Sequence, residues 1–171
     1  MIALVTCAAA RAADTDLPLL LAELPEAVIV EWDDPDTDWT VFDHVIIRST
    51  WDYHLRRSDF LGWVERVDAA STLWNRPDDL RWNTDKRYLA DLERAGVPIV
   101  PSVFLTDSDA VERHAASVGF DGDIVVKPTV GASASGVLAT HQDPSAASDH
   151  ARSLLADGLV PMVHPYLHGV D

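Results

Sequence analysis

The sequence has one cysteine, few basic residues and no long apolar run. Cys7 has no partner for an internal disulfide, which fits a cytoplasmic protein. Because 13 Lys and Arg face 28 Asp and Glu, the formal net charge is -15, which argues against a nucleic acid partner. The longest apolar runs are far below the ~20 residues of a membrane-spanning helix, so no membrane partner is expected.

Two common nucleotide-binding motifs are also missing. No Gly-x-Gly-x-x-Gly occurs, which argues against a Rossmann dinucleotide site. Gly131 and Gly136 have the glycine spacing of a Walker A loop, but Val137 and Leu138 follow them where that motif requires lysine and Ser or Thr. A phosphate site in this chain must therefore be built in another way.

The first part of the chain predicts a small parallel α/β lobe. Apolar β-branched runs at 2–7, 27–32 and 42–50 indicate strands, and helical spacing of apolar residues follows at 17–24 and from Ser58. This alternation is typical of a parallel sheet covered by helices. A turn-rich stretch at 73–79 places the boundary of this lobe, 1–80, near residue 80.

The second part, 81–171, predicts a mixed α+β region. We expect a helix capped by Asn83-Thr84-Asp85, an extended segment at 97–101 and a helix opening at Asp107. A strand with a lysine, a loop, a return strand at 136–140, a helix from Asp143 and a last extended segment at 159–167 follow.

The most informative stretch is residues 124–137, which read IVVKPTVGASASGV. The β-branched run predicts a buried strand, and Pro128 favours an extended Lys127 at the end of that strand. The following loop offers Gly131, Gly136, the hydroxyls of Ser133 and Ser135, and free N–H groups that can cradle an anion. The alternative is a β-hairpin with a Gly/Ser turn and a lysine that reaches along the surface to solvent.

A strand lysine followed by a flexible Gly/Ser loop resembles the nucleotide site of the ATP-grasp ligases. The resemblance covers essentially the whole chain and extends to residues 48–53 (RSTWDY) and 85–89 (DKRYL). The similar branch includes the cyclo-ligase of D-cycloserine biosynthesis and relatives of the glutathione synthetase and ribosomal-protein modification ligases. It implies a pre-ATP-grasp lobe followed by the first ATP-grasp subdomain.

The resemblance also implies roles for residues on both sides of the loop. Lys86, at a predicted helix start, would reach the phosphates of ATP together with Lys127. Residues 163–171 (VHPYLHGVD) resemble the hinge that lines the adenosine pocket. There His164 would accept from the adenine amino group, a place where the family has Glu or Gln. Tyr166 and Leu167 would supply backbone contacts, and Asp171 would bind the ribose.

One residue of the first lobe is a candidate for substrate binding. Arg48 stands at the end of a predicted strand and could clamp a substrate carboxylate in bidentate geometry. The alternative is a structural ion pair of Arg48 with Asp52 or another of the many acids. Trp51 and Tyr53 would line the pocket or pack in the core.

The chemistry implied by the resemblance is carboxylate activation by ATP. The γ-phosphoryl group would pass to a carboxylate, and an amine would attack the acylphosphate and release phosphate, giving ADP and an amide-type bond. The Mg²⁺ ligands of this family lie beyond the hinge, and this chain ends at Asp171. We therefore expect the front part of a ligase, without a complete active site of its own.

Two hypotheses of different classes remain open from the sequence. The first is an ATP-dependent carboxylate–amine or cyclo-ligase, present as its N-terminal portion and acting on a small carboxylate or amine substrate. The second is a non-catalytic α/β nucleotide-binding or interaction module. Apolar surface that a further subdomain would cover could promote self-association, so a homo-oligomer is one possible assembly.

Overall fold

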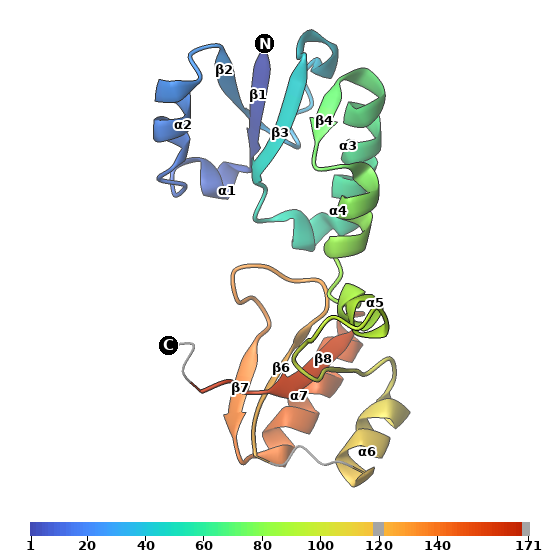
Figure 1. Cartoon of the computed structure of the whole chain (residues 1–171). Helices are drawn as coiled ribbons and strands as arrows, with labels where there is room; N and C mark the ends of the chain where they lie inside the picture. The colour runs from blue at the N-terminus through green and yellow to red at the C-terminus, as the bar shows by residue number, and fades with distance from the viewer. Residues whose placement is uncertain (118–121, 169–171) are drawn as a thin grey trace. The chain divides into compact units, whose positions relative to one another are not determined.

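The structure is a computed structural model, and it describes residues 1–117 and 122–168. The chain forms two compact units, Met1–Thr84 and Asp85–Asp171. Figure 1 colours the first unit from blue to green and the second from green to red. Among the described residues, no helix has the length and apolar character needed to cross a membrane.

The first unit contains a four-stranded parallel sheet in the order β2-β1-β3-β4 (Figure 1). This arrangement confirms the predicted parallel α/β lobe. Its elements are β1 (Ile2–Thr6), α1 (Ala8–Arg11), α2 (Leu17–Glu23), β2 (Ala27–Glu31), η1 (Trp39–Val41), β3 (His44–Ser49), η2 (Tyr53–Arg56), α3 (Arg57–Ala70), β4 (Thr72–Trp74) and α4 (Pro77–Asn83).

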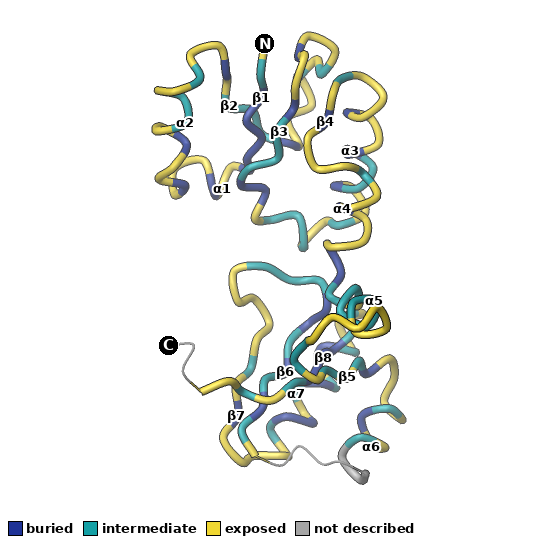
Figure 2. Tube along the Cα trace, viewed as in Figure 1, coloured by how far each residue is buried: buried dark blue, intermediate teal, exposed yellow. Residues whose placement is uncertain are grey.

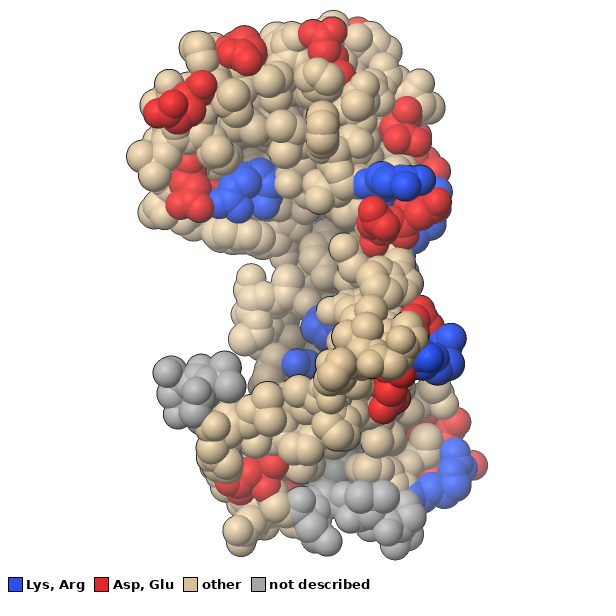
Figure 3. Space-filling view, in the orientation of Figure 1, with Lys and Arg blue, Asp and Glu red and all other residues tan. Residues whose placement is uncertain are grey.

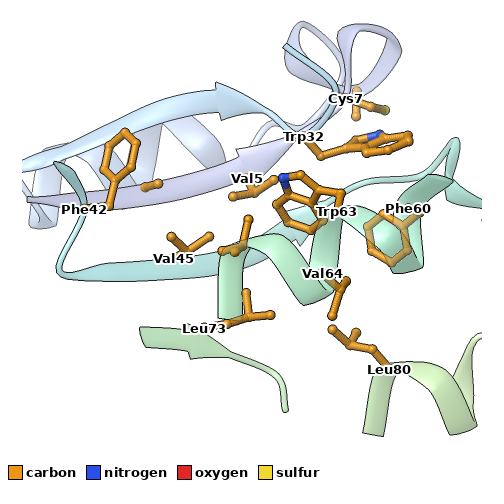
Figure 4. Packing of buried hydrophobic residues seen from close by; sticks show 13 residues of the cluster. Val5, Cys7, Trp32, Phe42, Val45, Phe60, Trp63, Val64, Leu73 and Leu80 are labelled. Carbon is orange, nitrogen blue, oxygen red and sulfur yellow. The ribbon is translucent and has the colours of Figure 1, made fainter. Parts of the chain in front are cut away.

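Successive residues of β1 serve two different cores, as the alternation of side chains along a strand requires. Val5 packs on the face covered by α3, whereas Leu4 packs with Leu17 of α2 on the other face. Figure 4 shows the α3 side, where Phe60 and Trp63 lie among the strand residues. Their rings are stacked with centroids 5.4 Å apart. The aromatic residues thus fix α3 on the sheet.

The stretch 73–79 differs from the prediction of a turn-rich boundary. It contains the end of the short edge strand β4 and the start of α4, which begins at Pro77. Proline fits the first helical turn because its missing N–H has no intrahelical partner there. The end of α4 also falls on Asn83, with Thr84 after it, so these residues close a helix instead of opening one.

The second unit contains an antiparallel sheet in the order β5-β8-β6-β7 with α6 and α7 packed on one face. A mixed second region, as predicted, is therefore present. Its elements are α5 (Tyr88–Arg94), β5 (Val103–Phe104), α6 (Ser108–Ser117), β6 (Asp123–Pro128), β7 (Leu138–His141), α7 (Pro144–Ala156) and β8 (Pro161–Pro165).

The strands and the connecting loop of this unit differ in burial. Ile124 and Val126 of β6 and Val163 of β8 are buried against the helices. The loop between β6 and β7 is half-buried at Gly131 and Ala132 and exposed at 133–137 (Figure 2). A packed sheet therefore supports a solvent-facing loop.

Candidate functional site

The sheet register of the second unit places Lys127 and His164 on one face. In the antiparallel pair of β6 and β8, Lys127 is opposite Met162 and Val125 is opposite His164. Opposed residues project to the same face, and that face alternates with the one used by Val126. Lys127 and His164 therefore lie on the face opposite the apolar core.

Lys86 reaches the same region from the segment before α5. Its ε-ammonium donates to the carbonyl oxygens of Gly131 at 2.8 Å and Thr129 at 3.4 Å. Its backbone N–H also donates to the Thr129 oxygen, at 2.9 Å. Lys86 lies two residues before a seven-residue helix, so the predicted helix start is wrong and carbonyl contacts position this lysine instead.

Asp85 was not predicted as a site residue, yet it stabilises this arrangement. It is buried, and its carboxylate accepts from the backbone N–H and the guanidinium of Arg87. It also accepts from the hydroxyl of Thr129. Burial, the largest effect, would raise the pKa of Asp85, but the hydrogen bonds and charge of Arg87 and the hydrogen bond of Thr129 together outweigh burial and lower the pKa. The segment that carries Lys86 is thereby tied to the end of β6. In the sequence, the only signal for this role of Asp85 was its position directly before Lys86.

The loop between β6 and β7 has a conformation that depends on its two glycines. A Cβ atom at Gly131 would lie 3.1 Å from Pro128 Cγ, and one at Gly136 would lie 3.2 Å from Pro128 Cδ. Gly136 has φ of +68°, and Ser133 and Ala134 also have positive φ, at 51° and 57°. These glycines have a packing role, whatever ligand the loop contacts.

Several polar groups of this loop remain available to a ligand. The N–H groups of Ser135 and Val137 donate to carbonyl oxygens within the loop. Among the described residues, no partner is found for the N–H of Ser133 or for the hydroxyls of Ser133 and Ser135. The loop therefore keeps hydrogen-bond donors for a molecule from outside.

Lys86, Lys127 and the loop enclose a cavity of about 290 Å³. Its lining consists of Lys86, Lys127, Pro128, Gly131, Ala132, Ser133, Ala134, Ser135 and Val137. In the described part of the chain, this lining includes no acidic residue, although Figure 3 shows acidic side chains on the visible faces of both units. The cavity is thus a local basic site on an acidic protein.

The lysines of this cavity are the only two lysines in the sequence. Burial lowers the pKa of Lys127. Burial also lowers the pKa of Lys86, the positive charge of Lys127 adds to that effect, and Asp85 opposes it. Two cations held near each other in a partly desolvated site are disfavoured unless an anion joins them. The electrostatics therefore favour a polyanion as ligand.

His164 has one nitrogen satisfied and one without a partner. Nδ1 lies 2.9 Å from the Pro165 carbonyl oxygen, which can only accept, so Nδ1 carries the proton. Nε2 is then an acceptor, and it is buried with no hydrogen-bond partner among the described residues. Burial, followed by the charge of Lys127, lowers the pKa of His164, while the Pro165 carbonyl opposes the shift. A neutral, acceptor imidazole therefore stands near Lys127.

The other hinge residues have different surroundings. Tyr166 donates its backbone N–H to the Asp123 oxygen, and its ring contacts His141 and His168. Leu167 is exposed, and Asp171 lies outside the described residues. The structure thus brings Lys86, Lys127 and the loop together around one cavity, whereas Tyr166 and Leu167 are absent from its lining.

Arg48 lies at the end of β3, where it is paired with two carboxylates. It donates to Asp16 at 2.5 Å and to Asp14 at 3.4 Å, and its side chain is one-third exposed. A structural ion pair with one of the many acids, the alternative drawn from the sequence, is therefore present, although Asp52 accepts from Trp32 and Arg56 instead. Arg48 as a clamp for a substrate carboxylate stays a prediction.

The first unit has larger cavities, but acidic residues line them together with the cations. One of about 530 Å³ lies beside Trp32, Trp39 and Trp63. The guanidinium of Arg56 on its wall stacks over Trp32 and is paired with Asp33. This cavity therefore offers no unpaired cluster of cations comparable to the lysine pair.

A magnesium site was expected to lie outside this chain. Among the residues that the structure describes, no three His, Cys, Asp or Glu side chains are grouped so as to hold a metal ion.

Comparison with known proteins identifies related chains. The family model described as D-cycloserine synthetase DcsG, N-terminal domain, matches residues 2–75. The cycloserine biosynthesis protein DcsG of Streptomyces lavendulae is 36% identical over 180 residues, which cover 100% of this chain and 60% of that protein. A crystal structure of D-cycloserine synthetase DcsG has a TM-score of 0.88 at 35% identity, covering 99% of this chain and 60% of the other.

Two more distant structures share the fold. An ATP-grasp RimK domain protein from Sphaerobacter thermophilus has a TM-score of 0.70 at 15% identity, covering 98% of this chain and 64% of the other. D-alanyl-alanine synthetase A from Vibrio cholerae has a TM-score of 0.72 at 14% identity, covering 97% and 60%. This chain spans 60% of the length of DcsG. The chain is therefore homologous to DcsG and has the fold of the N-terminal part of the ATP-grasp ligases.

Proposed function

We propose that this chain is the nucleotide-binding front part of an ATP-dependent ligase that joins a carboxylate to an amine, or closes a ring, through an acylphosphate. One observation carries the proposal: the only two lysines of the sequence line a single cavity beneath a loop with unused hydrogen-bond donors. Homology to DcsG supports the ligase class. The expected products are ADP, phosphate and an amide-type bond.

The residues of the cavity would act by binding and neutralising the phosphates. Transfer of a phosphoryl group depends mainly on positioning and charge stabilisation, with little covalent help from the protein. The ammonium groups of Lys86 and Lys127 would contact the phosphate oxygens, and the N–H of Ser133 and the hydroxyls of Ser133 and Ser135 would cover them. Exclusion of water by the loop would protect the acylphosphate from hydrolysis.

The base and the substrate would be bound by residues outside this lining. His164 Nε2, an unpaired acceptor, would accept from the adenine amino group, with backbone groups of Tyr166 and Leu167 beside it and Asp171 at the ribose. Arg48 would bind the carboxylate of a small substrate by exchanging one of its acidic partners for that group.

Protection by ATP tests the nucleotide site directly. The melting temperature of the chain is measured with and without ATP for the wild type, Lys127→Met and the control Arg113→Met, which changes an exposed cation on α6. A charge-assisted contact is worth about 1.5–3 kcal/mol, so we expect Lys127→Met to weaken ATP binding about 10- to 100-fold. The control should keep the wild-type shift.

Equal protection of Lys127→Met and wild type would contradict the proposed site. A second measurement separates the ligase from the non-catalytic module. ATP is incubated with a longer protein that contains this chain and with candidate amino acids. Formation of ADP that depends on a carboxylate and an amine supports the ligase, whereas ATP binding without turnover of any candidate supports the module.

A further inference from the structure

The two lysines share one cavity but have different partners. Lys86 donates to two carbonyl oxygens and has the Asp85 carboxylate nearby. The ε-ammonium of Lys127 has no hydrogen bond and no ion pair with any described residue. The ε-amine of Lys127 is therefore the less constrained of the two.

This difference affects which lysine is available as a nucleophile. An amine reacts only in its neutral form, so burial without an anionic partner increases the reactive fraction. Burial lowers the pKa of Lys127, and no described acidic residue lines the cavity to reverse that effect. Burial lowers the pKa of Lys86 as well, but its hydrogen bonds to two carbonyl oxygens occupy the ε-ammonium and restrict its movement.

The cavity also limits what can reach Lys127. Its volume of about 290 Å³ and its small lining side chains, Gly131, Ala132 and Ala134, leave room for a short acyl group. Hydrogen-bond donors of Ser133 and Ser135 lie in the same lining and can hold a phosphate. A small molecule that carries both an acyl group and a phosphate matches this combination.

We propose that Lys127 is an acylation site, modified by small acyl phosphates in preference to Lys86. The neutral ε-nitrogen attacks the acyl carbon, and a carbon–nitrogen bond forms. The bond between that carbon and the phosphate oxygen breaks, and the phosphate leaves with the electron pair. The nitrogen then loses a proton to water, so that the products are an amide and inorganic phosphate.

Acylation would remove the positive charge of Lys127 and place an acyl group in the cavity. If the proposed function holds, the modified chain would lose its affinity for ATP, and this consequence alone rests on that proposal. The acylation itself requires only the unpaired amine and the cavity.

The sequence permits a direct test with acetyl phosphate as the probe. Cleavage before aspartate releases Lys86 in the peptide 85–90 and Lys127 in the peptide 123–142, and acetylation of lysine does not affect either cleavage. The chain is treated with acetyl phosphate, and acetylation of both peptides is followed by mass spectrometry. The same reaction in urea gives the ratio for the unfolded chain.

The folded chain should acetylate Lys127 about tenfold faster than Lys86, because a hydrogen bond from the Lys86 ammonium to a carbonyl oxygen must break first, at a cost of about 1.4 kcal/mol. The ratio should approach one in urea. Lys127→Arg should remove the signal from 123–142 without raising the rate at Lys86. Equal rates in the folded chain, or a faster Lys86, would overturn the proposal.

A parallel reaction with ATP separates this proposal from the proposed function. Slower acetylation of Lys127 in the presence of ATP supports both. If Lys127 remains the preferred site and ATP has no effect on its rate, the acylation site stands and the nucleotide site at this cavity is refuted.

Discussion

The arginines of the first unit and the lysines of the second unit are used in opposite ways. In the first unit, Arg48, Arg56 and Arg81 each contact two carboxylates. In the second unit, neither lysine forms an ion pair with a described residue, and both line the cavity. Paired cations brace a structure, whereas unpaired and partly buried cations have a cost that a bound anion can offset.

The tryptophans and the lysines are also divided between the two units. All six tryptophans occur at or before residue 82, whereas both lysines occur after residue 85. Tryptophan fluorescence therefore reports on the first unit, and isotope-labelled lysine side chains report on the second.

The largest effect is expected from Trp63→Ala in the first unit. Trp63 is fully buried and contacts Phe60, Trp32 and Trp39, so its removal leaves a large cavity and should cost about 3–5 kcal/mol. Urea unfolding followed by tryptophan fluorescence measures this loss. Trp74→Ala, at an exposed position of β4, serves as the control and should cost far less.

Independence of the two units is tested in the same variant. If each unit has its own core, the lysine signals of Trp63→Ala should keep their wild-type positions. Movement of both lysine signals would break the comparison, because it would show that the first core determines the geometry of the cavity in the second unit.

An intermediate effect is expected from Gly136→Ala in the second unit. A left-handed conformation costs a residue with a Cβ atom about 1–2 kcal/mol, and at Gly136 that atom would also meet Pro128 at 3.2 Å. Gly158→Ala is the matched control, since Gly158 also has positive φ but no atom within 4 Å of the added Cβ. Chemical unfolding followed by the lysine signals should show the larger loss for Gly136→Ala. Equal losses would mean that the loop moves away from Pro128 at no cost.

The smallest effect is the pH dependence of His164. Its pKa is lowered below 6.5 in the folded chain, so the unfolded chain binds the proton first as the pH falls. Stability should therefore decrease as the pH drops below 6.5 and level off below the lowered pKa. His164→Gln should reduce this decrease in urea unfolding measured between pH 7.5 and 5. His114, whose pKa burial also lowers, contributes equally to both proteins and cancels in the difference. An unchanged profile would show that the imidazole remains accessible to protons.

The elements that were predicted well have long or strongly patterned sequences. The β-branched run before Lys127 forms β6, and the apolar spacing of Phe60, Val64 and Val67 forms the buried face of α3. Burial selects such patterns directly, because apolar side chains must share a face. The resemblance of 85–89 and 124–137 to a known family then indicated which polar residues were candidates for the site.

The elements that were missed are short or depend on contacts distant in sequence. β4 has three residues and is a strand only because β3 offers a parallel partner. Pro77 followed by two aspartates is a helix-start signal that was interpreted as a turn. The position of Lys86 depends on carbonyl oxygens more than forty residues away, which no local pattern encodes.

The division of tryptophans and lysines has a further practical consequence. A fluorescent ATP analogue bound at the lysines would accept excitation energy from donors that belong only to the other unit. The efficiency of that transfer would report the distance between the tryptophans of the first unit and the nucleotide in the second. It would also register any approach of one unit to the other as the nucleotide binds.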